Sequence, residues 1–209
     1  MSRAPSSAVR AGFLIVALAV LLSGWEPWRR DIWLMEASPA AVGMGLMALL
    51  WRRFPWTPLT VFWCVAFSLV LCGGAHWSYA RVPLGHWVQE QFDLSRNPYD
   101  RLGHFLQGVT PALLAREMLL RRTPLRAGRA LFWIVCAIAL AISALYELIE
   151  WWAALLTDPD AGTAFLGHQG DAWDTQWDMA LALGGALFVQ LLFARLHDRQ
   201  LQQLTNATN

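Results

Sequence analysis

Six long apolar stretches constrain this chain more than any other feature of its sequence. Each is long enough to cross the roughly 30 Å hydrocarbon core of a bilayer as a helix. Turns containing Pro, Gly and Arg separate them, and none alternates as a strand would. The sequence therefore predicts an all-α, polytopic membrane helix bundle with six transmembrane helices, forming a single integral membrane domain over residues 1–209. The stretches run over about 9–25, 32–51, 57–80, 99–120, 130–154 and 174–195.

The arginines predict how the bundle is oriented. The chain has no lysine, and ten arginines lie in the loops and ends on the side of the two termini, against five on the other side. Cytoplasmic loops are enriched in positive charge. We therefore expect both termini to be cytoplasmic, with the lipid bilayer as the partner of the protein. The net charge of +1 and the lack of a basic face give no reason to expect nucleic-acid binding.

Seven ionisable side chains interrupt four of these stretches near the ends that face away from the termini. An ionisable group at mid-bilayer costs at least about 2.5–3.5 kcal/mol, so each one needs a reason. At a helical rise of 1.5 Å per residue, all seven fall within one layer about 10 Å thick, in the expected outer leaflet. They are His76, Asp100, His104, Glu147, Glu150, Asp174 and Asp178.

Most of these residues form pairs on single helix faces, which lets four helices point acids and imidazoles at a common point. The pairs are Asp100 with His104, Asp174 with Asp178, and Glu147 with Glu150. The candidate catalytic residues are Asp100, His104, Glu147, Glu150, Asp174 and Asp178. The candidate metal ligands are His76, His104, Glu147, Asp174 and Asp178. A mixed nitrogen and oxygen set suits Zn, Mn or Fe, and a carboxylate site suits Mg.

Several polar residues near this layer have more than one interpretation. Asp171 or Asp174 could cap the last helix. Arg96 and Arg101 could neutralise the acids or bind a lipid phosphate. Glu36 could join the layer or reach the headgroups.

Other polar residues are expected to lie apart from the layer. His76, although it lies in the layer by depth, could belong to the site or only hydrogen-bond a neighbour. Arg116 and Glu117 are expected to form an interfacial pair with Arg121, one turn further on. His86, His168 and His197 are expected in loops or the tail, and the three cysteines inside apolar runs are expected to be small buried side chains.

Four sequence runs resemble the YjdF-type bacterial inner-membrane proteins, a family of unknown function. The runs are GGAHWSYARVPLGHW, RNPYDRLGHFLQGVTPALLAREMLLR, ALYELIEWW and FLGHQGDAWDTQWDMALALGGAL, within residues 70–190. The resemblance implies a membrane protein and supplies no reaction. Its motif residues correspond to His76, Tyr79, Arg96, Asn97, Asp100, His104, Gln107, Glu117, Glu147, Glu150, Gly167, Gln169, Gly170, Asp171, Asp174, Gln176 and Asp178. The order Asp-x-x-x-His, Glu, Asp is also similar, as an analogy only, to VanZ-like membrane proteins.

Three functions are consistent with this polar layer. The first is a metal-dependent membrane enzyme that acts on a lipid or lipid-linked substrate. The second is a structural or partner protein in which the polar cluster fixes helix packing. The third is a proton- or cation-coupled transporter, although the polar layer does not continue through the membrane and no inverted repeat is evident.

Overall fold

Helices make up most of the described chain, which comprises residues 4–156 and 168–206 of a computed structural model. No strand occurs in these residues, so the prediction of an all-α fold is confirmed. The α-helices are α1 (Ser7–Ser23), α2 (Arg30–Leu50), α3 (Pro58–Trp77), α4 (Pro83–Gln91), α5 (Tyr99–Arg122), α6 (Arg129–Leu156) and α8 (Asp174–Asn206), and η1 (Tyr79–Arg81) is a 3-10 turn.

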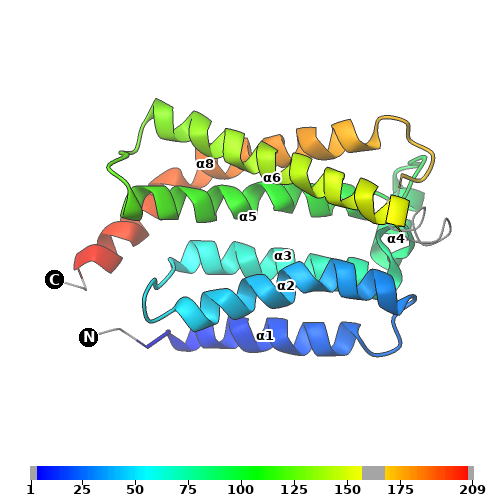
Figure 1. Cartoon of the computed structure of the whole chain (residues 1–209), viewed down its shortest axis with the longest axis horizontal. Helices are drawn as coiled ribbons and strands as arrows, with labels where there is room; N and C mark the ends of the chain where they lie inside the picture. The colour runs from blue at the N-terminus through cyan, green and yellow to red at the C-terminus, as the bar shows by residue number, and fades with distance from the viewer. Residues whose placement is uncertain (1–3, 157–167, 207–209) are drawn as a thin grey trace.

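The long helices form two groups that lie side by side (Figure 1). In the first group, α1, α2 and α3 bury a core that includes Val16, Met44 and Cys64. In the second, α5, α6 and α8 pack around Val109 and Val135, and α3 also contacts this core. The described parts of α1 and α8 nearest the two chain ends lie at the same end of the bundle, which we call the termini end. The opposite end, where α5 and α8 begin, is called the site end.

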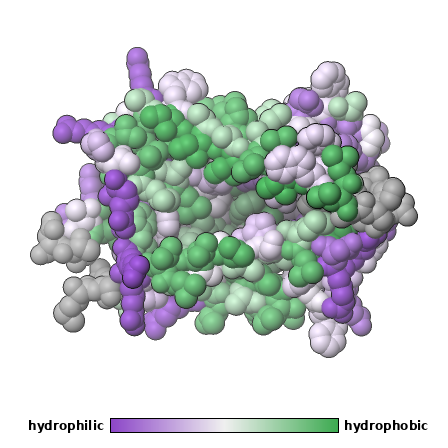
Figure 2. Space-filling view, viewed as in Figure 1, coloured by the Kyte–Doolittle hydropathy of each residue, from purple (hydrophilic) through white to green (hydrophobic). Residues whose placement is uncertain are grey.

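Within the described residues, four helices are long and apolar enough to cross a membrane: α2, α3, α6 and α8. Helix α1 is apolar but has only 17 residues, and α5 is 24 residues long but carries many polar side chains. Figure 2 shows an apolar band between two polar ends on the face that it displays. The membrane helix bundle is therefore confirmed, whereas the count of six spans and the side of the termini remain predictions.

Close backbone contact joins α5 to α8 at two glycines. A Cβ atom on Gly108 would overlap the carbonyl oxygen of Ala182, and one on Gly185 would overlap that of Phe105. Small residues at such crossings let membrane helices approach closely. This crossing brings the start of α8 against the start of α5, where most of the polar layer lies.

A fully buried polar cluster lies at the termini end. The carboxylate of Glu117 accepts hydrogen bonds from the hydroxyls of Thr57 and Thr60, both at 2.8 Å, and pairs with Arg121 at 2.8 Å. Its Oε2 also lies 3.2 Å from Nε2 of His197. We call these residues, together with Arg116, the Glu117 cluster. It joins the start of α3 to the ends of α5 and α8.

Two expectations about this end of the chain are wrong. His197 is not a tail residue, because α8 continues to Asn206 and buries the imidazole completely. Glu117 does pair with Arg121, but its side chain is buried rather than interfacial, and Arg116 pairs with Asp198 at 2.8 Å. His86 lies in α4 rather than in a loop, whereas His168 lies outside the helices as expected. Gly167 lies outside the described residues.

Candidate functional site

His104 lies at the centre of the polar residues at the site end. Its Nε2 atom is 3.4 Å from Oδ1 of Asp100, one turn earlier on α5, and 3.8 Å from Oδ2 of Asp178 on α8. The side chains of His104 and Asp178 are only 7% and 4% exposed. One imidazole nitrogen therefore faces two carboxylates from different helices in a nearly dry environment.

The other ring nitrogen of His104 fixes the orientation of the imidazole. Nδ1 lies 2.9 Å from Oε1 of Gln107 and 3.7 Å from Oε1 of Glu147 on α6. Oε1 of Gln107 is an acceptor within hydrogen-bond distance, so Nδ1 carries a proton and donates it to Gln107, whereas Glu147 is too far for a hydrogen bond. In a neutral ring, the lone pair of Nε2 then points at Asp100 and Asp178. Metal-ligating histidines are commonly oriented in this way by a group on the second nitrogen.

The donor atoms of Asp100, His104 and Asp178 have a spacing that a metal ion could use. All three lie within 4.8 Å of one another. With metal–ligand distances of ~2.1 Å, neighbouring ligands of a tetrahedral site lie ~3.4 Å apart, close to the observed distances from Nε2. In addition, Oδ1 of Asp178 accepts no hydrogen bond from the described residues. A protonated imidazole between two carboxylates would fit the same coordinates.

Arg96 balances part of this negative charge. Its guanidinium, in the segment before α5, donates to Asp174 and also to Asp100 at 3.2 Å. Burial lowers the pKa of Arg96, but the hydrogen bond and charge of Asp174 more than offset it, so the net pKa is raised. Arg101 pairs with Asp171 at 3.1 Å. Both arginines therefore neutralise acids, one of the two roles expected for them.

Asn97 and Gln169 join the segment before α5 to the segment before α8. The backbone N–H of Asn97 donates to Oε1 of Gln169 at 3.0 Å, and Nε2 of Gln169 donates back to the carbonyl of Asn97 at 3.1 Å. The Asn97 side chain is fully buried and donates to the Val82 carbonyl at 3.1 Å. These contacts give a structural role to Asn97 of the RNPYD run and Gln169 of the GHQGD run, neither of which bonds to His104.

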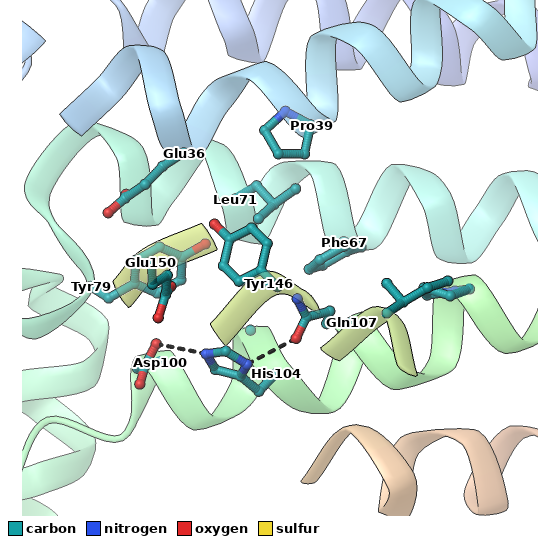
Figure 3. Close-up of a pocket in the computed structure, with 13 residues that line it drawn as sticks. Glu36, Pro39, Phe67, Leu71, Tyr79, Asp100, His104, Gln107, Tyr146 and Glu150 are labelled. Atoms are coloured by element: carbon teal, nitrogen blue, oxygen red, sulfur yellow. Dashed lines mark hydrogen bonds and ion pairs between the residues drawn. The ribbon is translucent and has the colours of Figure 1, made fainter. Parts of the chain in front are cut away.

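A cavity of about 160 Å³ adjoins His104 between the two groups of helices. Figure 3 shows polar side chains gathered toward one part of it and Phe67 and Leu71 toward another. Sequence reasoning did not single out Tyr146, because phenol groups are common in apolar helices, and it named Gln107 only as a motif residue of the family resemblance. The polar lining residues are Glu36, Tyr79, Asp100, His104, Gln107, Tyr146 and Glu150.

The structure brings together most, but not all, of the candidates from sequence. Asp100, His104, Glu147 and Asp178 are in mutual reach, and Glu150 lines the cavity. Glu147 faces Nδ1, the ring nitrogen turned away from Asp178. Asp174, at the first residue of α8, pairs with Arg96 instead of His104. Asp171 accepts from the backbone N–H of Trp173 at 2.9 Å, in the turn that precedes α8 rather than at a helical N–H.

His76 does not lie with these residues. Its Nδ1 atom is 3.0 Å from the carbonyl oxygen of Ser23, and its ring packs edge-on against Trp77. It does not line the cavity described here. We therefore omit it from the candidate metal site. Glu36, which was left open, does line the cavity and is only 3% exposed.

The fold and this site define a helical membrane protein with a buried histidine–carboxylate centre at one end of its bundle. The chain belongs to the DUF2238 family of predicted membrane proteins, whose model matches residues 8–199. It is 47% identical over 190 residues to the inner membrane protein YjdF of Escherichia coli (strain K12). The aligned region covers 91% of this chain and 90% of that protein. No solved structure matched the chain.

These comparisons confirm the resemblance that the motifs carry and extend it almost to both chain ends. They also confirm the membrane location, and the relative is an inner membrane protein. The chain is thus an integral membrane protein of a family whose description gives no activity.

Proposed function

We propose that this protein is a metal-dependent membrane enzyme that acts on a lipid or lipid-linked substrate. The observation that carries the proposal is the convergence of Asp100, His104 and Asp178 beside a cavity in the membrane-embedded bundle. A divalent ion held there would polarise a phosphoryl or acyl oxygen, or supply hydroxide near neutral pH. One nitrogen and two carboxylate ligands suit Zn, Mn or Fe, and a Mg site is the more oxygen-rich version.

Each neighbouring residue has a distinct role in this proposal. Gln107 holds the His104 ring with Nε2 toward the two aspartates. Glu147 and Glu150 are the remaining acids available for proton transfer, since Asp174 is paired with Arg96. Arg96 positions Asp100 and Asp174 and compensates their charge.

The proposed topology places this site just below the outer headgroups. Six helices that cross the bilayer, with both termini cytoplasmic, would put the termini end inside and the site end outside. The common position of the two chain ends fits an even number of crossings (Figure 1). A site at that depth suits a lipid linkage near the membrane surface.

A structural role is the alternative favoured by a specific observation. The ion pairs of Arg96 join Asp100 on α5 to Asp174 on α8, and they could serve only to hold these helices together. Transport is less favoured, because the described part of α5 carries few polar side chains between Gln107 and Arg116. The enzyme proposal predicts a bound divalent metal, whereas the structural role predicts none.

Metal analysis is the direct test. We expect the protein purified in detergent without chelator to hold stoichiometric divalent metal, and His104→Ala or Asp178→Asn to lose it. Each substitution removes one of the proposed ligand atoms. The measurement is elemental analysis, and the matched control is His86→Ala, because His86 is exposed on α4 and contacts only Gln89 among the interactions found for it.

A second measurement separates loss of metal from loss of fold. Cys64, Cys72 and Cys136 are buried and free, so a thiol-reactive fluorophore reports thermal unfolding. Metal-free wild-type protein, with both variants unfolding at the wild-type temperature, would favour the structural role. Metal retained by both variants would place it elsewhere.

A further inference from the structure

The cavity beside His104 has a second acidic part that the proposed metal ligands do not use. Glu36 on α2 and Glu150 on α6 line it from different helices, and the rings of Tyr79 and Tyr146 lie beside them (Figure 3). Tyr79 and Asp100 line the same cavity as Glu36, so these groups lie near one another. This part of the cavity joins α2 to the site built on α5, α6 and α8.

Glu36 is a buried carboxylate that points into this cavity without a full set of partners. Glu36 is only 3% exposed, and its Oε2 atom accepts no hydrogen bond from the described residues. Leaving a buried charge unpaired is costly. Arg96, the buried arginine of the site, is engaged by Asp174 and Asp100. Glu36 therefore lacks a cationic partner among the interactions found for it.

The cavity opens toward lipid rather than water. Among its lining residues, Pro39 of α2 and Ile142 of α6 are exposed, and Figure 2 shows a recessed surface between these two helices. Both helices expose further apolar side chains, including Leu34 of α2 and Leu145 of α6 at 61% and 52% exposure. A surface of this kind lies in the hydrocarbon layer of a membrane. Ligands would thus enter sideways from the bilayer.

The size of the cavity limits what it can hold. A volume of about 160 Å³ is near that of a protein cavity of ~150 Å³ that admits benzene. This is enough for a lipid headgroup but not for acyl chains, which would remain in the opening beside Phe67, Pro39 and Ile142. The headgroup would then lie between Asp100 with His104 on one side and Glu36 with Glu150 on the other.

We infer that Glu36 and Glu150, with Tyr79 and Tyr146, form a recognition site for the ammonium group of a membrane phospholipid. Carboxylates pair with an ammonium, and aromatic faces attract cations. This inference rests on the proposed function: the phosphate of the same headgroup would face the metal site, a few ångströms away. A zwitterionic headgroup carries both charges that are needed: its ammonium would pair with Glu36 and Glu150, and its phosphate would face the metal ion.

Lipid competition tests this inference. We expect native mass spectrometry of the detergent-purified protein, given equal phosphatidylethanolamine and phosphatidylglycerol, to show about tenfold preference for phosphatidylethanolamine. In Glu36→Gln or Glu150→Gln the preference should fall to near equality, because the charge is removed and the shape is kept. The control is Glu90→Gln, an exposed glutamate of α4, which should keep the wild-type preference.

The outcomes separate the source of the amine and the two proposals. Displacement of phosphatidylethanolamine by millimolar ethanolamine would assign the site to a soluble amine and overturn the lipid part of the inference. Equal binding of both lipids by the wild type, or an unchanged preference in both variants, would overturn it entirely. Wild-type protein that holds metal but binds both lipids equally would overturn the lipid inference alone, whereas wild-type protein that prefers phosphatidylethanolamine but holds no metal would overturn the metal proposal alone. Glu36→Gln is expected to retain its metal while losing the lipid preference. Unfolding temperatures confirm that the variants are folded.

Discussion

Replacing Gly108 with alanine is expected to separate α5 from α8 and to disable the site. The added Cβ would overlap the carbonyl oxygen of Ala182, which is backbone and has no freedom to rotate away. Overpacking usually costs about 1–3 kcal/mol, and a backbone clash lies at or above the upper end of that range. We expect a loss of about 3 kcal/mol, which corresponds to a fall of roughly 6–12 °C in unfolding temperature. Thiol labelling during heating measures this.

Two adjacent glycines of α8 supply a matched comparison for this prediction. Gly185→Ala should be as damaging as Gly108→Ala, because its Cβ would overlap the carbonyl oxygen of Phe105. Gly184→Ala should be neutral or stabilising by about 0.5–1 kcal/mol, since open space surrounds its Cβ position and alanine favours helix. Equal stability of the two α8 variants would show that the α5–α8 crossing is not as close as described.

The same substitutions should affect metal before they affect the rest of the fold. Asp178 lies on α8 and His104 on α5, and 3.8 Å separates their facing atoms. A separation of the two helices by even ~1 Å would break this geometry. We therefore expect Gly108→Ala and Gly185→Ala to lose metal, and Gly184→Ala to keep it.

Replacing Glu117 with alanine is expected to have the second large effect, at the other end of the bundle. Glu117 is fully buried and accepts hydrogen bonds from Thr57, Thr60 and Arg121. Removing one partner of a buried ionic network costs about 3–5 kcal/mol. The expected fall in unfolding temperature is therefore about 6–20 °C, measured by the same thiol labelling.

The hydrogen bonds of His197 make Glu117→Gln an informative second variant. Nδ1 of His197 lies 3.1 Å from Arg116, which can only donate, so Nδ1 accepts and Nε2 donates to Glu117. In Glu117→Gln the neutral amide keeps the shape but pairs less well with Arg121 and His197. We expect a loss intermediate between that of Glu117→Ala and no loss. Glu90→Ala, on the exposed surface, should change stability by less than ~0.5 kcal/mol; a Glu117→Ala variant as stable as this control would contradict the prediction.

The sequence predicts the helices and the depth of their polar residues well. Hydropathy marks α3 and α6 closely, and counting along the helices places Asp100, His104 and Asp178 at one level. Depth follows from a fixed rise per residue, which is a local property. The confirmed family membership reflects the same polar motifs.

Rotation about each helix axis is what the sequence does not provide. His76 lies at a suitable depth by counting, yet it faces Ser23 of the first helical group. Its direction depends on how α3 packs against α1, which is a tertiary property. The buried location of His197 was missed for a related reason, because the end of α8 is polar and hydropathy stops near residue 195. Its burial depends on partners from α3 and α5.

Helix α5 has a polar anchor near each end, with Asp100 at one and Glu117 at the other. At 1.5 Å per residue these anchors lie about 26 Å apart along the helix, slightly less than the typical 30 Å thickness of bilayer hydrocarbon. In the proposed six-span topology, these two anchors fix the length of α5 that can face hydrocarbon, because neither can slide along the helix. Bilayers of longer-chain lipids would then have to thin around the protein, so its stability should be highest in bilayers that are somewhat thinner than average.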